Sequence, residues 1–469
     1  MNWAKLQFGS VLAAAAILCG CSKDNSPAGP TDAECHLSPA SLPFGTVAVG
    51  SSVDLTFIIS NSGGKTLSGT ISATCDNFIV IGDASYSLGT GEADTFAVRF
   101  TPTAPGNQVC TIQTGSSACT GVSCTGAGAS YDYYVDAVAG NDDSSGTASA
   151  PFKTITHALK VAGENTTVGA RPGTYDEANG EQFPIHLQPG QRLIGDIANK
   201  GLGSTSTWVY GAALADPLSG NNWLAAIVAA ESSFVAGFKF GAPPQHGTWG
   251  VYISNTGAEV AHCTFGGTSS SLYGGIYTTG AGEMEIEESD FLTGSYGVYI
   301  YGCTDRVSVR SNQFLTMAIP MDVVEFTPDT VVVIESNFFV GSGQIGIQVQ
   351  GGAPRIEGNT FNKPDGYATY GAVRCWSTTS NATVRGNSFV CARAIQIDNA
   401  ATPDLGSVTH PGANNFSGVT VEAVYHMGSS SVSAIGNAWR HSPPVCGTDI
   451  VLTGGGSVTW GSGGGENCP

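Results

Sequence analysis

The C-terminal half of the chain repeats one short phrase, which consists of an apolar residue, two variable positions, an Asn, one further position and an aromatic residue. The clearest copies end at Phe314, Phe339, Phe361 and Phe389, and each has its Asn two residues earlier. Looser copies end at Phe240, Phe265, Phe291, Phe416 and Trp439, so successive aromatic residues lie about 25 residues apart. Self-similarity at such a period is typical of a solenoid, in which each copy forms one coil.

A second phrase in each coil is a small residue followed by an alternating strand, as in Gly297-Val-Tyr-Ile300. Because side chains alternate between the faces of a strand, the apolar members should point into the solenoid and the others outward. The aligned outward pairs are Tyr252 and Ser254, Tyr277 and Thr279, Tyr299 and Tyr301, Pro320 and Asp322, Gln348 and Gln350, Arg374 and Trp376, Gln396 and Asp398, and Tyr425 and Met427. This alignment predicts that Pro320 shares a row with Tyr299.

The Asn column allows two interpretations. Six amides in a row are able to bind a ligand, but each Asn lies between two strands, where a tight turn needs a residue that tolerates left-handed backbone angles. The side-chain amides of stacked Asn residues can also form hydrogen bonds from one coil to the next. We therefore interpret the Asn column as a structural turn ladder and the Phe column as core packing.

This arrangement resembles the asparagine ladder of right-handed single-stranded parallel β-helix proteins of the pectate-lyase-like (pectin-lyase-like) superfamily. Upstream, Tyr134-Val-Asp136, Gly140-Asn-Asp142 and Arg171-Pro-Gly-Thr-Tyr175 resemble the opening of such proteins, and are most similar to a bacterial domain family of unknown function. Helical apolar spacing within 154–162 predicts a capping helix over the first coil, because terminal coils otherwise expose strand edges.

Residues from Cys35 onward alternate short apolar runs with turns, which indicates an immunoglobulin-like β-sandwich. Ser38-Pro39, Phe44-Gly45, Val49-Gly50 and Phe100-Thr-Pro102 resemble the ASPM/SPD-2/hydin type of immunoglobulin-like domain, which implies a spacer or a module for a protein partner. Four of its five cysteines can form two disulfides, with the pairing left open. The predicted fold class is therefore all-β, a sandwich followed by the β-helix.

The amino terminus has Lys5, an apolar run from Phe8 to Leu18, and then Cys19-Gly-Cys21. The run is too short to span a bilayer and predicts a signal peptide. Leu18-Cys-Gly-Cys21 resembles the lipobox of bacterial lipoproteins, which implies cleavage before Cys21, lipidation of Cys21 and a lipid anchor in the bacterial cell envelope, at the outer membrane or cell surface. The expected organisation is signal peptide 1–20, tether 21–34, sandwich 35–128, and β-helix with its cap 129–469.

The net charge limits the kinds of partner that the chain is expected to bind, and the predicted export route determines whether its cysteines can form disulfides. The chain has 18 Lys and Arg against 37 Asp and Glu, a net charge of −19, which excludes nucleic acid as an expected partner because phosphates would be repelled. Export permits disulfides, and we expect Cys446 to pair with Cys468, whereas Cys375 and Cys391 either pair or stay buried.

Aromatic residues on one face at coil spacing suit stacking on sugar rings, although Tyr on a sheet is also simply a good strand former. The candidate carbohydrate-binding residues are Tyr252, Tyr277, Tyr299, Tyr301, Gln348, Trp376 and Gln396. The leading expectation is an exported, lipid-anchored surface protein whose β-helix binds extracellular polysaccharide or a surface glycan.

Catalysis is the alternative, with Arg374, Asp322 and Asp398 as the catalytic candidates. Lyases of the resembling fold use calcium and an Arg or Lys base, and its hydrolases use paired or triple Asp. Asp322 and Asp398 are three coils apart, roughly 14 Å, which is too far to share one calcium or to form a glycosidase pair. Arg374 is expected to form a salt bridge with Asp398.

Asp322, Glu325 and Asp329 are the weak candidates for a cation site, so calcium is the one cofactor considered. The sequence leaves open a polysaccharide lyase, ahead of a glycoside hydrolase, and a structural or adhesive stalk.

Overall fold

The computed structural model describes residues 32–203, 206–211, 224–242, 248–254, 257–267, 272–324, 330–341, 343–461 and 466–468. The predicted signal peptide, Cys21, most of the tether, Glu325 and Asp329 lie outside these residues. No helix within the described ranges is long and apolar enough to cross a membrane.

The N-terminal domain is a mainly antiparallel β-sandwich, with β2 and β9 paired in parallel, in which most strands alternate buried and exposed side chains. One sheet has the order β1-β3-β7-β5, a second has the order β2-β9-β8, and β4 pairs with β6. The strands are β1 Cys35–Ser38, β2 Ser41–Ala48, β3 Val53–Asn61, β4 Leu67–Thr70, β5 Phe78–Ile81, β6 Ser85–Leu88, β7 Ala93–Phe100, β8 Gly106–Ile112 and β9 Val122–Ala129. Disulfides Cys35–Cys119 and Cys75–Cys110 confirm the two expected bridges, and Cys124 stays free and buried.

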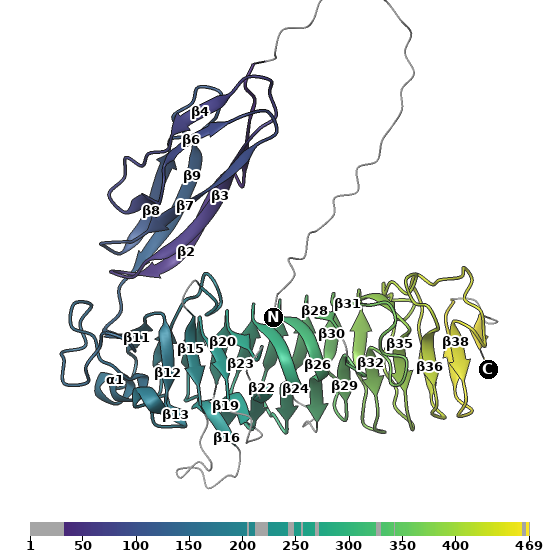
Figure 1. Cartoon of the computed structure of the whole chain (residues 1–469). Coiled ribbons are helices and arrows are strands. Elements are labelled where there is room, and N and C mark those ends of the chain that lie inside the picture. Colours follow the sequence, from purple (N-terminus) through teal and green to yellow (C-terminus); the bar gives the residue numbers. More distant parts are fainter. Residues whose placement is uncertain are drawn as a thin grey trace, which may run out of the picture.

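The rest of the described chain winds into a long stack of parallel coils, seen from the side in Figure 1. Each typical coil contributes a strand to each of three walls. We call the ten-stranded sheet wall 2; its strands are β10 Tyr133–Val135, β11 Thr167–Ala170, β14 Arg192–Ile194, β17 Ser233–Ala236, β20 Ala258–Ala261, β23 Met284–Glu287, β25 Val307–Arg310, β27 Val332–Glu335, β30 Arg355–Glu357 and β33 Thr383–Arg385.

The eighteen-stranded sheet supplies the other two walls, because β24 (Asp290–Tyr301) and β26 (Gln313–Val324) each turn a corner and belong to both. Wall 1 contains the C-terminal parts of β24 and β26 with β13 Ile185–His186, β16 Leu224–Val228, β19 Thr248–Ser254, β22 Leu272–Thr279, β29 Ile347–Val349, β32 Val373–Cys375, β35 Arg393–Ile397, β36 Glu422–His426 and β38 Ile450–Leu452. Wall 3 contains their N-terminal parts with β12 Gly173–Asp176, β15 Thr207–Tyr210, β18 Lys239–Gly241, β21 Thr264–Phe265, β28 Phe338–Val340, β31 Thr360–Lys363 and β34 Ser388–Cys391.

The Phe column forms the predicted core. Rings from Phe240 to Phe389 stack nearly parallel, for example Phe339 on Phe361 with centroids 4.7 Å apart and 9° between planes. In several coils a glycine faces this stack. A Cβ on Gly297 would lie 2.7 Å from the Phe314 ring, and one on Gly346 would lie 2.8 Å from Phe361. Glycine at these positions is therefore needed to leave room for the ring.

The Asn column forms the predicted ladder. The side-chain amide of Asn337 donates to Oδ1 of Asn359 at 3.0 Å, and that of Asn359 donates to Oδ1 of Asn387 at 3.0 Å. The same oxygens also accept the backbone N–H groups of Asn337 and Asn359. Because each of these amides is almost fully buried, the ladder satisfies backbone groups at every turn.

The expected left-handed conformation of the Asn itself is wrong. Positive φ occurs instead one residue earlier, at Ser311 (56°), Ser336 (56°), Gly358 (63°) and Gly386 (63°). The preceding residue makes the sharp bend, and the bend directs the Asn side chain inward to the neighbouring coils.

Both ends of the stack are closed. Helix α1 (Ile155–Ala162) buries Ile155, Ala158 and Leu159 against the first coils, as its apolar spacing predicts, and a short helix η1 (Glu177–Asn179) follows nearby. At the C-terminus, β37 (Ser431–Ser433), β39 (Ser457–Thr459) and β40 (Asn467–Cys468) form a small sheet, and the expected Cys446–Cys468 disulfide is present. Cys375 and Cys391 are buried and unpaired.

Candidate functional site

One row of outward side chains runs along wall 1 and contains most of the candidate residues. Parallel pairing places Tyr252, Tyr277, Tyr299, Asp322, Gln348, Arg374, Gln396 and Tyr425 opposite one another in successive coils. We call this set the outer row. It differs from the sequence alignment at one coil, because Tyr299 pairs with Asp322 rather than Pro320. Pro320 instead lies opposite Gly297, where its carbonyl would contact an added Cβ.

The first part of the outer row is aromatic and packs upon itself. Trp249 lies 5.3 Å from Tyr277, and Tyr277 stacks on Tyr299 at 5.4 Å with 10° between planes. Tyr252 and Tyr277 are each only 5% exposed, so the expectation of a fully exposed strip is wrong for these two residues. Tyr299 is half-buried and Tyr301 is exposed.

Trp249, in the coil of β19, packs against Tyr252 and Tyr277 on the outer side of wall 1. Strict alternation along the strand would have pointed Trp249 inward. In this coil Gly250 and Val251 both face the interior, so Trp249 is displaced to the outside, and a register shift occurs at Thr248/Trp249. Tyr296, the residue before Gly297, likewise lies on the outer side of wall 1, where it contacts Trp249 and Tyr299. Tyr252 and Tyr277 therefore support the aromatic surface, whereas Tyr296, Tyr299 and Tyr301 reach solvent in part.

The second part of the outer row is a continuous polar network. Asp322, 1% exposed, accepts hydrogen bonds from Gln348 Nε2 at 3.1 Å and from Gln350 Nε2 at 2.9 and 3.0 Å. Arg374 donates to Oδ2 of Asp398 through Nε at 2.7 Å and Nη2 at 2.6 Å, which confirms the expected salt bridge. Gln396 donates to the other oxygen of Asp398 at 2.9 Å.

The two carboxylates of this network have different electrostatic environments. Burial raises the pKa of Asp322 to about 6, and the hydrogen bonds from Gln350 and Gln348 only partly oppose that rise. Asp398 has the Arg374 guanidinium as a direct counter-charge. Burial also raises the pKa of Tyr299, to about 12, with a further contribution from the neighbouring charge of Asp322.

An open cleft of about 640 Å³ adjoins the network on the outer side of wall 1. The guanidinium of Arg374 lies 4.6 Å from the ring centroid of Tyr370 and 5.0 Å from that of Trp376, which is 42% exposed. We call this the wall-1 cleft; its lining residues are Thr316, Met317, Ala318, Ile319, Gln344, Ile345, Gln348, Tyr370, Arg374 and Trp376.

Sequence reasoning found Gln348, Arg374 and Trp376 but missed Tyr370 and Gln344. Both missed residues lie between strands, outside the periodic phrases, so no spacing pointed to them. Of the other candidates, Gln396 is buried beneath the network, and the carbohydrate-binding roles of all seven residues stay predictions.

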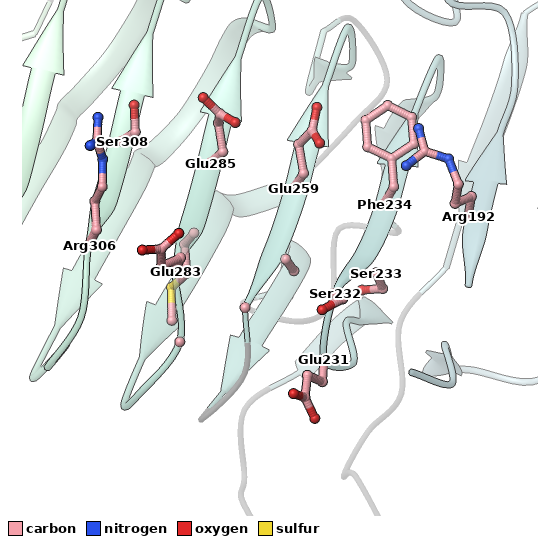
Figure 2. Close-up of a pocket in the computed structure, with 14 residues that line it drawn as sticks. Arg192, Glu231, Ser232, Ser233, Phe234, Glu259, Glu283, Glu285, Arg306 and Ser308 are labelled. Atoms are coloured by element: carbon pink, nitrogen blue, oxygen red, sulfur yellow. The ribbon is translucent and has the colours of Figure 1, made fainter. Parts of the chain in front are cut away.

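A second concavity, of about 580 Å³, lies on wall 2 and was not anticipated from the sequence. Figure 2 shows Phe234, Glu259 and Glu285 on adjacent strands, with Arg192 over the Phe234 ring at 4.0 Å. Burial raises the pKa of Glu259, and the charges of Glu287 and Glu285 add to that effect. This groove presents carboxylates and little aromatic surface, so it suits a sugar ring less well than the wall-1 cleft does.

The structure assembles no clear metal centre. Within the described residues, no three His, Cys, Asp or Glu side chains lie where they could hold one ion. The predicted cation site cannot be placed, because two of its three residues, Glu325 and Asp329, lie outside the described ranges. His426 is fully buried, and its Nε2 lies 2.8 Å from the Ser430 carbonyl oxygen.

Comparisons with known proteins agree with this architecture. The model of a family described as a protein of unknown function (DUF1565) matches residues 138–309, and the model described as right handed beta helix region matches residues 245–389. The second match confirms the right-handed β-helix. No curated protein matches the sequence.

Several solved structures are similar in part. The catalytic unit of a GH87 alpha-1,3-glucanase from Streptomyces thermodiastaticus is 12% identical, with 88% of this chain and 90% of that chain covered and a TM-score of 0.40. A GH136 lacto-N-biosidase from Eubacterium ramulus is 11% identical over 63% of this chain and 64% of that chain, with a TM-score of 0.36. The ASH / PapD-like domain of human CEP192 is 11% identical over 26% of this chain and all of that domain, with a TM-score of 0.19.

Proposed function

We propose that this chain is an exported, lipid-anchored surface protein whose β-helix binds polysaccharide in the wall-1 cleft. One observation supports this above the others: the rings of Tyr370 and Trp376, which flank the Arg374 guanidinium, line the same cleft as the polar side chain of Gln348. Small-molecule sites are concave and combine apolar surface with a few oriented polar groups. A sugar ring has an apolar face and a rim of hydroxyls, so it matches both kinds of surface.

The outer row also suits a polymer rather than a single sugar. Beyond the cleft it continues in one direction to Tyr299 and in the other to Tyr425, which stacks under Arg393 at 4.0 Å. Neighbouring strands of a sheet are about 4.8 Å apart, so a chain lying along the row would pass its partly exposed members, Tyr299, Arg374 and Tyr425, in turn.

Trp376→Ala is expected to weaken polysaccharide binding by about tenfold or more, because exposed aromatic anchors in a site contribute most of its binding energy. A glycan array with the full chain identifies the ligand, and calorimetry on that ligand measures the loss. Phe338→Ala is the matched control, since Phe338 is a comparably exposed aromatic residue on wall 3. Unchanged binding in the Trp376 variant would contradict the proposal and favour the adhesive stalk.

A glycoside hydrolase is the second candidate, and the raised pKa of Asp322, about 6, favours it. A carboxyl group with a pKa near 6 keeps its proton in mildly acidic solution, where it is able to act as a general acid. The lyase alternative is less well supported, because its base would be Arg374, which is bound to Asp398. Release of reducing ends from a polysaccharide panel by the full chain, without the absorbance of unsaturated lyase products and with loss of the activity in Asp322→Asn, would establish hydrolysis.

Lipid anchoring depends on Cys21, outside the described residues. Cys21→Ser is expected to abolish incorporation of labelled fatty acid into the chain in a bacterial host, and the protein should then leave the membrane fraction. Continued labelling of that variant would contradict the anchor.

A further inference from the structure

We infer that the wall-1 cleft selects neutral glycans and discriminates against uronate polymers, an inference that rests on the proposed function. The inference is based on two charged groups at the cleft. The guanidinium of Arg374 is already paired with Asp398, and the carboxylate of Asp322 is held by neutral amides.

The cation of the cleft is already paired within the protein. Arg374 is the one charged residue among those described in the cleft lining, and two of its nitrogens already bind Asp398. Both side chains are largely buried, at 15% and 9% exposure, and Tyr370 and Trp376 flank the guanidinium. A uronate would have to use the remaining N–H groups of Arg374, of which Nη1 already donates to Gln348 Oε1 at 3.5 Å, or displace Asp398 and leave that buried carboxylate without its counter-charge.

A second cation, Lys363 on wall 3, is also engaged. Its ammonium group donates to the Gly343 carbonyl at 2.9 Å and lies 5.4 Å from the Tyr367 ring centroid. Burial lowers the pKa of Lys363, because desolvation opposes its charged form.

An anion for which the described residues provide no ion-pair partner, Asp322, lies directly behind the cleft. Gln348 lines the cleft and donates to Asp322, so the carboxylate is one side chain away from a bound ligand. The groups that hold Asp322 are the neutral amides of Gln348 and Gln350. At neutral pH this negative charge, in a partly desolvated site, would repel a uronate carboxylate, whereas it costs a neutral sugar nothing.

The test compares chemically matched ligands. Polygalacturonate, alginate and glucuronan are each offered to the full chain beside their carboxyl-reduced forms, which keep the linkage and lose the charge, with a neutral glucan and galactan series in the same panel. Affinity electrophoresis at pH 7.5 and physiological salt is expected to show at least about tenfold tighter binding of a reduced form than of its parent uronan. Equal or tighter binding of the parent uronans would overturn the inference.

Two variants test the cause. Asp322→Asn should reduce the preference for the reduced form by about threefold or more, and Asp398→Asn, which frees Arg374, should increase uronan binding. Asp143→Asn is the matched control, because it removes one exposed charge in the cap, far along the sequence from the cleft. A preference that stays the same in Asp322→Asn, with normal folding, would overturn the inference even if Asp398→Asn fails to fold.

The outcomes separate this inference from the proposed function. Uronan binding that is as tight as binding of the reduced form, and that is lost in Trp376→Ala, would keep the proposed function and overturn the neutral selection. Absence of binding to every polysaccharide of the panel would overturn both.

Discussion

Asn359→Ala is expected to lower the free energy of unfolding of the β-helix by about 4 kcal/mol. The side chain is fully buried, and its Oδ1 accepts from the backbone N–H and the amide of Asn337 at 2.9 and 3.0 Å. Its own amide donates to the Ile334 carbonyl at 2.9 Å and to Asn387 at 3.0 Å. Truncation would leave several buried groups without partners, and each one costs about 1 to 3 kcal/mol.

Asn362→Ala is the matched control, because Asn362 lies three residues later on β31 and is exposed. Urea unfolding followed by far-ultraviolet circular dichroism compares the two variants, with sandwich and β-helix transitions fitted separately. In a solenoid each coil contacts mainly its neighbours, so the loss should destabilise the adjoining coils most. A loss no larger than that of the control would mean that water replaces the ladder, and would contradict its structural role.

The repeat made the architecture predictable. A Phe, an Asn two residues before it, and a small residue before an alternating strand recur in register, so a single alignment gives the core, the ladder and most of the outer row. These features follow from local periodicity and depend little on contacts between distant segments.

The features that the sequence missed depend on how coils fit against one another. Two adjacent inward positions, Gly250 and Val251, break the alternation and place Trp249 over Tyr252 and Tyr277, which an alternating pattern cannot indicate. The sequence alignment placed Asp322 in the row of Tyr301, whereas the structure places it opposite Tyr299. The error arose because the alignment took Ala318 as the small residue of that coil. Counting from the core would have corrected this, since Phe291 to Tyr299 and Phe314 to Asp322 are equal separations.

The cleft itself was only half predictable. Gln348, Arg374 and Trp376 belong to repeated strands, but Tyr370 comes from a turn with no repeat equivalent. The pKa of Asp322 also could not be inferred from the sequence, because it depends on burial and on the identity of two amide neighbours.

Asp322→Asn is expected to stabilise the folded protein at alkaline pH, by about 2 to 3 kcal/mol. The folded-state pKa of Asp322, about 6, lies above the ordinary value of 3.8, so between these values the folded state binds more protons than the unfolded state. Wild-type stability therefore falls as pH rises from about 4 to about 6, and the cost persists above that range. Asn has nearly the same shape and carries no charge, so the variant escapes the cost.

The measurement is the free energy of unfolding of wild type and Asp322→Asn at pH 4, 6 and 8. The difference in favour of the variant should be near zero at pH 4 and greatest at pH 8. Asp143→Asn, whose carboxylate is exposed, should show no such trend. A variant that is less stable than wild type at pH 8 would mean that Gln348 and Gln350 stabilise the charge of Asp322 more than burial opposes it. The carboxylate would then be ionised throughout the physiological range, which would remove the general-acid argument while leaving its repulsion of uronates intact.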